Sequence, residues 1–95
     1  MYSSHQLSTM KVVYKSVEMP EDLQTYVEEL TKSAMTLYAV EKDIAKHIKC
    51  DLDSNKGGVW HVIVGKNFGC YVTHDRNNFL YFSIADMSFL VFRIG

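Results

Sequence analysis

The sequence has few cysteines and no long apolar run, and each shortage excludes a class of protein. Its two cysteines, Cys50 and Cys70, are too few for a disulfide framework and too widely spaced for a paired metal-ligand motif, so reduced thiols are expected. No run of about 18 apolar residues is present to span a membrane. Residues 1–10 lack the apolar core of a signal peptide. We therefore expect a cytosolic protein with no metal, no cofactor and no membrane partner.

The sequence also has no clear excess of positive or negative charge, and this bears on nucleic-acid binding. The chain carries a net charge of −1, whereas domains that bind phosphate backbones usually have a clear excess of lysine and arginine. Residues 66–72 come close to the central strand of an RNA recognition motif, but Asn67 replaces its glycine and Cys70 separates Gly69 from the aromatic Tyr71. A shift of one residue turns that aromatic to the opposite face of the strand. The sequence therefore does not favour a nucleic-acid partner.

Motifs that carry catalysis are missing as well. The four histidines include no pair spaced as H-x-x-x-H, and the sequence contains neither G-x-S-x-G nor a glycine-rich phosphate loop. The remaining option pairs Cys70 or Ser83 with His61 or His74, but the spacing implies no positioned base and no orienting third group. We expect no enzyme, and we expect Cys70 to be a small buried hydrophobic residue.

What the sequence does contain is the pattern of one globular domain. Hydrophobic residues make up 47% of the chain and charged residues 22%, which is typical of a globular protein with a single modest core. Residues 1–10 are polar and without a period, and they predict a flexible N-terminal arm. Residues 11–95 predict a single domain.

Two amphipathic helices are predicted after a first strand at residues 11–17. Pro20 followed by two acidic residues predicts a helix start, and the apolar period continues to about Tyr38. A second helix is predicted at about residues 41–50, and residues 51–58 have the composition of a loop. The buried stripes are predicted to consist of Leu23, Val27, Leu30, Ala34 and Leu37 in the first helix and of Ile44, Ile48 and Leu52 in the second.

Four further strands are predicted in the second half of the chain, at residues 60–64, 68–74, 79–84 and 87–94. The last of them is nearly all apolar, so we expect it to lie centrally in a sheet or at an interface. The element order is β-α-α-β-β-β-β. This order predicts an α+β fold in which two helices pack on one face of an antiparallel β-sheet.

The strand predicted at residues 68–74 has two unlike faces. One face carries Phe68, Cys70, Val72 and His74, and the other carries Gly69, Tyr71 and Thr73. A strand with a glycine, an aromatic ring and a hydroxyl on one side suits the addition of a partner's extended segment through main-chain hydrogen bonds.

His61 and His74 each have a structural and a functional interpretation. A strand histidine beside Trp60 is often a satisfied, partly buried side chain. His61 is also a candidate proton switch, because a neutral imidazole held between apolar surfaces must be desolvated to become charged, so that acid would separate those surfaces.

Two long motifs resemble a known family. Residues 41–49 read Glu-Lys-Asp-Ile-Ala-Lys-His-Ile-Lys, and residues 60–74 read Trp-His-Val-Ile-Val-Gly-Lys-Asn-Phe-Gly-Cys-Tyr-Val-Thr-His. From about residue 11 to the C-terminus, the chain resembles the eight-kilodalton class of cytoplasmic dynein light chain, the dynein light chain type 1/2 family.

The resemblance implies a strand-exchanged homodimer in which the exchanged strand is residues 68–74. It also implies two equivalent grooves at the dimer interface, each of which accepts a linear peptide with a Thr-Gln-Thr-like core as an extra strand. Such proteins are non-enzymatic dimerisation hubs of the cytoplasm and the microtubule cytoskeleton, and their partners include the dynein intermediate chain. Bivalent binding raises the effective concentration of the two partner chains.

The resemblance also assigns residues to the groove and to the interface. Glu41 and Lys42 match the positions at a helix start that receive the glutamine of the peptide, where first-turn N–H groups lack partners. His61 matches the interface histidine, so acidic pH is expected to favour monomers. The implied groove residues are Lys15, Glu41, Lys42, Asn67, Phe68, Gly69, Tyr71, Thr73, His74, Phe79 and Tyr81, and the implied interface residues are His61, Val62, Cys70 and Val72.

Departures from the family pattern indicate a divergent member. Ser83 stands where the family usually has a groove tyrosine, and Ser88 replaces a small apolar residue near the groove floor. Ile94 replaces a serine that is a regulatory phosphorylation position in relatives, and residues 55–58 lack the family's proline. The alternative function is a small structural or regulatory protein with an altered groove that acts outside the motor complex.

Overall fold

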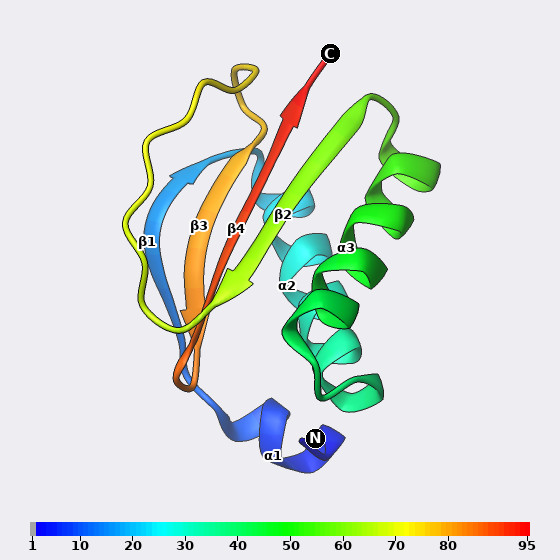
Figure 1. Cartoon of the computed structure of the whole chain (residues 1–95), viewed down its shortest axis with the longest axis vertical. Helices are drawn as coiled ribbons and strands as arrows, with labels where there is room; N and C mark the ends of the chain where they lie inside the picture. Colours follow the sequence, from blue (N-terminus) through cyan, green and yellow to red (C-terminus); the bar gives the residue numbers. More distant parts are fainter. Residues whose placement is uncertain (1) are drawn as a thin grey trace.

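A four-stranded antiparallel sheet lies at the centre of the molecule, and two long helices cover one of its faces (Figure 1). The structure, a computed structural model, describes residues 2–95. In chain order the elements are α1 (Ser4–Thr9), β1 (Val12–Glu18), α2 (Glu21–Leu37), α3 (Glu41–Lys56), β2 (Val59–Gly65), β3 (Phe79–Ile84) and β4 (Met87–Ile94). The predicted α+β class and the packing of two helices on an antiparallel sheet are confirmed. In this described part, no helix has both the length and the apolar character needed to cross a membrane.

The strand order is β1-β3-β4-β2, so that β1 and β2 form the two edges. The apolar strand β4 is central, as predicted, and pairs with β3 on one side and β2 on the other. Both of these strands run antiparallel to β4 over the whole length of their pairing. The outer edge of β2 has no strand beside it among the described residues.

The main hydrophobic core lies between the helices and the sheet. Alternate strand residues point into it because successive side chains of a strand face opposite ways. Both predicted helix stripes are largely confirmed, but Leu37 is 54% exposed because it is the last residue of α2. The fully buried members include Val27, Ala34, Met35, Ile48, Leu52, Trp60, Leu80, Phe82, Ile84, Phe89 and Val91.

Helix α3 is longer than predicted. The predicted loop at residues 51–58 was wrong for residues 51–56, which continue the helix to Lys56. Leu52 is fully buried, and the carboxylate of Asp53 accepts a hydrogen bond from the backbone N–H of Trp60. These tertiary contacts favour helix in a segment whose polar composition indicated a loop. The helix ends at Gly57, whose φ of 71° lies in the left-handed region that glycine tolerates.

The predicted flexible arm contains a short helix, α1. Ser3 and Gln6 form a capping box, in which the Ser3 hydroxyl accepts from the Gln6 N–H at 3.1 Å and the Gln6 side chain accepts from the Ser3 N–H at 2.9 Å. Leu7 is 1% exposed and belongs to the main core. This buried leucine holds α1 against α2. The flexibility of residues 1–10 stays a prediction, and Met1 lies outside the described residues.

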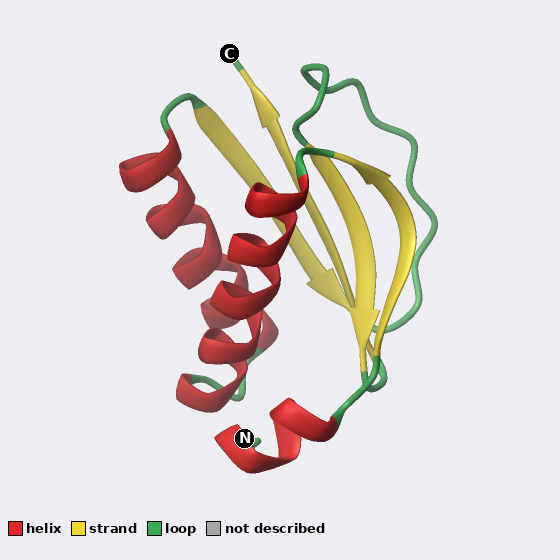
Figure 2. Cartoon of the chain, turned by 180° about the vertical axis from the view of Figure 1, so that it is seen from behind, coloured by secondary structure: helices red, strands yellow, loops and turns green. Residues whose placement is uncertain are grey.

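Residues 66–78 form a long irregular segment on the side of the sheet opposite the helices. In Figures 1 and 2 the sheet lies between this segment and the two long helices. The strand predicted at residues 68–74 is therefore wrong for the single chain, where these residues pair with no strand. Exchange of this segment between two copies stays a prediction.

Candidate functional site

The face of the sheet turned away from the helices, called here the open face, carries the candidate site. Strand pairing arranges its side chains in three rows across β1, β3, β4 and β2. The rows are Glu18, Phe79, Phe92 and His61; then Ser16, Tyr81, Leu90 and Ile63; then Val13, Ser83, Ser88 and Gly65. The face thus changes from aromatic at the first row to small and polar at the third.

A second, smaller hydrophobic cluster lies on the open face. Phe79, Leu90 and Phe92 are its buried members, and Phe68 and Val72 of the long segment pack against them. The ring of Phe68 stacks on that of Tyr81 with 5.5 Å between centroids, and the Tyr81 hydroxyl donates to the Phe68 carbonyl oxygen. The structure therefore brings together five predicted site residues: Phe68, Val72, His74, Phe79 and Tyr81.

His74 closes the aromatic end of the open face. Its ring stacks on Phe79 with 4.4 Å between centroids, and its Nδ1 lies 2.9 Å from the carbonyl oxygen of Asp75. Its Nε2 lies 3.5 Å from Oε2 of Glu18 at the end of β1. Sequence reasoning missed Glu18, because no local pattern links a strand-end carboxylate to a histidine in a distant segment.

The end of the long segment is tied to β4, but its first part is not. The N–H of Asp75 donates to the Arg93 carbonyl, and the N–H of Arg93 donates to the Asn78 carbonyl, both at 3.0 Å. Within the described chain, no backbone–backbone hydrogen bond involves residues 66–74. Apart from the Phe68 carbonyl, which accepts from the Tyr81 hydroxyl, their main-chain donors and acceptors are therefore available to another chain.

The predicted groove residues on the other side of this segment face solvent. Asn67, Gly69 and Thr73 are exposed, and the side chain of Tyr71 is fully exposed. Cys70 is also exposed, so the prediction of a buried cysteine was wrong for the single chain. Phe68 and Val72 of the same segment pack against the open face, whereas Cys70 between them does not belong to that cluster.

Lys15 lies over the polar end of the open face. Its Nζ is 3.1 Å from the Ser88 hydroxyl oxygen and 4.8 Å from the centroid of the Tyr81 ring. Ser88 is 3% exposed and lies directly opposite Ser83 in the β3–β4 pairing. The two serines that depart from the family pattern are therefore neighbours beneath one lysine.

Glu41 and Lys42 lie in the first turn of α3, away from this cluster. Neither side chain has a hydrogen-bond or ion-pair partner among residues 2–95, and both are exposed. The preceding residue, Val40, supplies no side-chain cap, so the N–H groups of Glu41 and Lys42 lack partners in the described chain, whereas the N–H of Asp43 donates to the Val40 carbonyl at 3.0 Å. Because α3 packs against β2, this helix start flanks the same edge strand that carries His61.

The other predicted interface residues divide between the two faces of the sheet. His61 is exposed on the open face and stacks on Phe92 with 5.3 Å between ring centroids. Val62 is half-buried, and its side chain packs against the main core on the helix side. By strand alternation Val62 therefore lies on the face opposite His61, and its place at a dimer interface stays a prediction.

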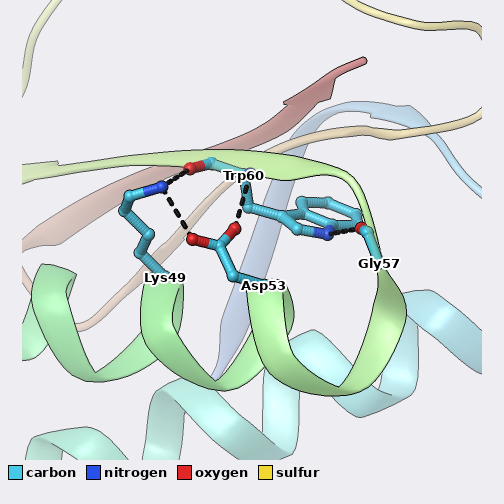
Figure 3. A network of polar contacts seen from close by, with 4 residues as sticks. All are labelled: Lys49, Asp53, Gly57 and Trp60. Atoms are coloured by element: carbon cyan, nitrogen blue, oxygen red, sulfur yellow. Dashed lines mark hydrogen bonds and ion pairs between the residues drawn. The ribbon is translucent and has the colours of Figure 1, made fainter.

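The position of β2 is fixed by a polar network at its start (Figure 3). The Lys49 ammonium donates to the Asp53 carboxylate at 2.8 Å and to the Trp60 carbonyl at 2.6 Å. The other Asp53 oxygen accepts from the Trp60 N–H at 2.7 Å, and the Trp60 indole N–H donates to the Gly57 carbonyl at 2.9 Å. This network joins α3 to β2 next to His61.

The hydrogen bonds from Lys49 and from the Trp60 backbone lower the pKa of Asp53. A carboxyl whose pKa is lower in the folded than in the unfolded protein stabilises the fold above its ordinary pKa, and this stabilisation is lost as the pH falls through the folded-state value. We expect Asp53→Asn to lower the free energy of unfolding by about 1 kcal/mol at neutral pH. This value is at the low end for a hydrogen bond to a charged group, because solvent screens the partly exposed Lys49–Asp53 pair. The cost should shrink as the pH falls below about 4.

Urea unfolding at pH 7 and at pH 3 measures this effect. Asp43→Asn on the same helix is the matched control, because Asp43 is exposed and its side chain has no partner in the described part of the chain. Equal effects of Asp53→Asn and Asp43→Asn at pH 7 would contradict the role given to the network.

Among residues 2–95, no three side chains of the histidine, cysteine, aspartate or glutamate type are grouped so that they could hold a metal ion.

Comparison with known proteins identifies the family. The sequence model of the family described as dynein light chain type 1 matches residues 11–94. The chain belongs to this family. The match begins after α1, so this short helix precedes the segment that defines a dynein light chain.

Relatives from three organisms are similar to this dynein light chain over most of its length. Dynein light chain 1, cytoplasmic, of Debaryomyces hansenii is 47% identical over 83 residues, which are 87% of this chain and 91% of the relative. Dynein light chain, cytoplasmic, of Emericella nidulans is 47% identical over 79 residues, 83% of this chain and 84% of the relative. A dynein light chain of Schistosoma mansoni is 42% identical over 89 residues, 94% of this chain and 100% of the relative.

A solved structure shares the fold of this dynein light chain. The dynein light chain-like domain of the Fasciola hepatica calcium binding protein FhCaBP2 superposes with a TM-score of 0.82 at 20% identity, covering 100% of this chain and 99% of that one. At this identity the likeness shows the fold alone.

Proposed function

We propose that the protein is a homodimeric, non-catalytic hub that binds short linear peptides by β-strand addition in grooves at its dimer interface. As a dynein light chain, it would serve the microtubule motor in the cytoplasm, the location that the names of two relatives state for those proteins. Its partners would be the dynein intermediate chain or other proteins with Thr-Gln-Thr-like motifs.

One observation carries this proposal: a strand-like segment without partners and an open sheet edge occur in the same chain. Residues 66–74 alternate in character as a strand does, yet their backbone groups make no hydrogen bonds to other backbone groups in the described chain. The outer edge of β2 likewise has no neighbouring strand there. Unpaired strand backbone favours pairing with another chain. If residues 66–74 of one copy paired with the β2 edge of a second copy, the segment and the edge would each gain a partner strand.

The exchanged segment would then build the groove. Its free edge would accept a peptide as a further strand, with Phe68, His74, Phe79 and Tyr81 lining the aromatic end. The start of α3 flanks β2, so the unpartnered N–H groups of Glu41 and Lys42 would face the groove of the dimer and donate hydrogen bonds to a glutamine carbonyl oxygen.

The test is calorimetric titration of the full chain with a Thr-Gln-Thr-core peptide and with the same peptide carrying alanine in place of its glutamine. We expect one peptide per protomer, and we expect the alanine peptide to bind at least about tenfold more weakly, since a lost hydrogen bond to a positioned donor costs about 1 to 2 kcal/mol. Sedimentation of the same samples should show a dimer.

Absence of binding by both peptides would contradict the hub and favour the alternative function, a structural or regulatory protein with an altered groove. Ser83 and Ser88 are the observation that keeps this alternative open, because they stand on the open face where the family has bulkier or apolar residues.

A further inference from the structure

The outer edge of β1 is the second unpaired edge of the sheet. β1 pairs with β3, and its other side has no strand beside it among the described residues. Three large side chains of β1 are more than one-third exposed, namely Val13 at 47%, Tyr14 at 38% and Val17 at 39%. Edges of this kind pair readily with other chains, and proteins commonly protect them with a charged residue or a bulge.

β1 has both a lysine and a bulge, and together they restrict which strand fits its edge. Tyr14 and Ser16 pair with successive residues of β3, so Lys15 is the extra residue of a β-bulge. The charge of Lys15 points over the sheet rather than outward, because its ammonium lies 3.1 Å from the Ser88 hydroxyl oxygen on β4. The bulge itself remains at the edge. A strand can pair along the whole edge only if it carries an extra residue at the same place.

β1 of a second copy carries that extra residue. If two β1 strands ran antiparallel about a two-fold axis at the bulge, Val12 of each copy would lie opposite Val17 of the other. In a regular strand, residues five positions apart lie on opposite faces. The bulge instead places both valines on the helix side, where they pair with Ile84 and Leu80 of β3. The joined sheet would therefore bring the two valines together on one face.

The charges at the two ends of β1 match in the same register. Lys11, the residue before β1, would lie opposite Glu18, its last residue, once on each side of the two-fold axis. Both residues are exposed, and Lys11 has no ion-pair partner among residues 2–95. Glu18 contacts His74 through Oε2, yet its side chain stays 55% exposed. Opposite charges at facing positions stabilise antiparallel strands, whereas like charges destabilise them.

Residues 66–74 run past the outside of β1 in the single chain (Figure 1). They make no backbone–backbone hydrogen bond there. Exchange of this segment onto the β2 edge of a second copy would carry it away from β1. The dimer would therefore expose a strand edge that the single chain partly covers.

We propose that two exchanged dimers join through their β1 edges, which pair antiparallel with Lys11 opposite Glu18. The inference rests on the proposed function, because exchange uncovers β1. Each dimer has two such edges, so the joined species are tetramers and then longer rows of dimers. The contact between two short strands is much smaller than a standard interface, so we expect a dissociation constant of about 0.1 to 1 mM.

The test is sedimentation velocity of the full chain at concentrations from about 10 μM to about 1 mM, a range that spans the expected dissociation constant. We expect dimers at the low end and tetramers at the high end. The tetramer fraction should fall as the salt concentration rises, since the facing charges are exposed.

Charge reversal locates the contact. Lys11→Glu and Glu18→Lys each place like charges opposite each other twice and should weaken tetramer formation about tenfold. The double variant Lys11→Glu/Glu18→Lys restores opposite charges at the wild-type net charge and should recover the tetramer. Lys46→Glu is the matched control, because it makes the same change of net charge at an exposed position on α3 and should leave the tetramer unchanged.

The outcomes separate the two proposals. If dimers form but no tetramer appears, or if the double variant does not recover it, β1 pairing is wrong while the exchanged dimer stands. Equal losses in Lys11→Glu and Lys46→Glu would trace the effect to net charge and would also contradict the pairing. If the chain is monomeric at every concentration, the exchanged dimer and the pairing of dimers both fail.

Discussion

The substitution Ile63→Glu is expected to convert the protein into a folded monomer that no longer binds peptides. Ile63 is 46% exposed in the single chain and lies on the open face of the edge strand β2. The fold of one chain can therefore accept a charge there. A dimer formed along β2 would have to bury that charge without a partner, at a cost of several kcal/mol. We expect dimerisation to weaken by more than about 100-fold.

Loss of peptide binding should accompany loss of the dimer, since the proposed groove needs the segment of a second copy. Sedimentation equilibrium and peptide titration of Ile63→Glu test both effects. Leu37→Glu is the matched control: Leu37 is 54% exposed and lies at the end of α2, on the helix side of the sheet. Full peptide affinity in a proven Ile63→Glu monomer would show that the groove belongs to one chain and would contradict strand exchange.

Replacing Trp60 by alanine is expected to have the largest effect on folding. Trp60 is fully buried, and its indole donates to the Gly57 carbonyl where α3 passes into β2. Truncation of a buried tryptophan leaves a large cavity and costs about 3 to 5 kcal/mol. Small domains have only about 5 to 15 kcal/mol of net stability, so this variant should be largely destabilised and its urea midpoint should fall sharply.

Trp60→Phe is the companion variant, because it keeps most of the buried ring but removes the indole N–H. We expect it to cost about 1 kcal/mol, the net contribution of the lost hydrogen bond to the Gly57 carbonyl, because Gly57 is exposed and its carbonyl can bond to water instead. Both variants should be measured in the Ile63→Glu background, where subunit dissociation does not contribute to the unfolding equilibrium. A loss of less than about 1 kcal/mol in Trp60→Ala would show that the α3–β2 junction does not depend on this side chain.

The sheet could be predicted from the sequence because its strands are defined by local composition. The predicted bounds of β3 and β4 agree with the structure, and those of β2 differ by one residue at each end. The end of α3 could not be predicted, because the polar residues 51–56 are held in the helix by contacts with Trp60 that appear only in the folded protein. The helix α1 did have a local signal, the Ser3–Gln6 capping box followed by Leu7.

The candidate site was predictable in part. The family resemblance named Phe68, Phe79 and Tyr81 as groove residues, and the structure joins them in one cluster. Their role in a groove stays a prediction. The contact of Glu18 with His74 and the reach of Lys15 to Ser88 depend on strand register and on a bulge, which no local pattern specifies. The alternation of side chains along residues 68–74 indicates a strand, but within the single chain no strand pairs with these residues.

The unpaired backbone of residues 66–74 has a consequence for the symmetry of any assembly. Each copy offers one segment to give and one β2 edge to receive. Two copies related by a two-fold axis would use both segments and both β2 edges at once, whereas one-way donation would leave a vacant β2 edge at one end and an unused segment at the other and would add copies into an open chain. A reciprocal pair is therefore the smallest closed assembly that this chain could form by exchange. A subunit damaged in residues 66–74 could receive a segment but donate none, so it could not close a reciprocal pair and would end an open chain.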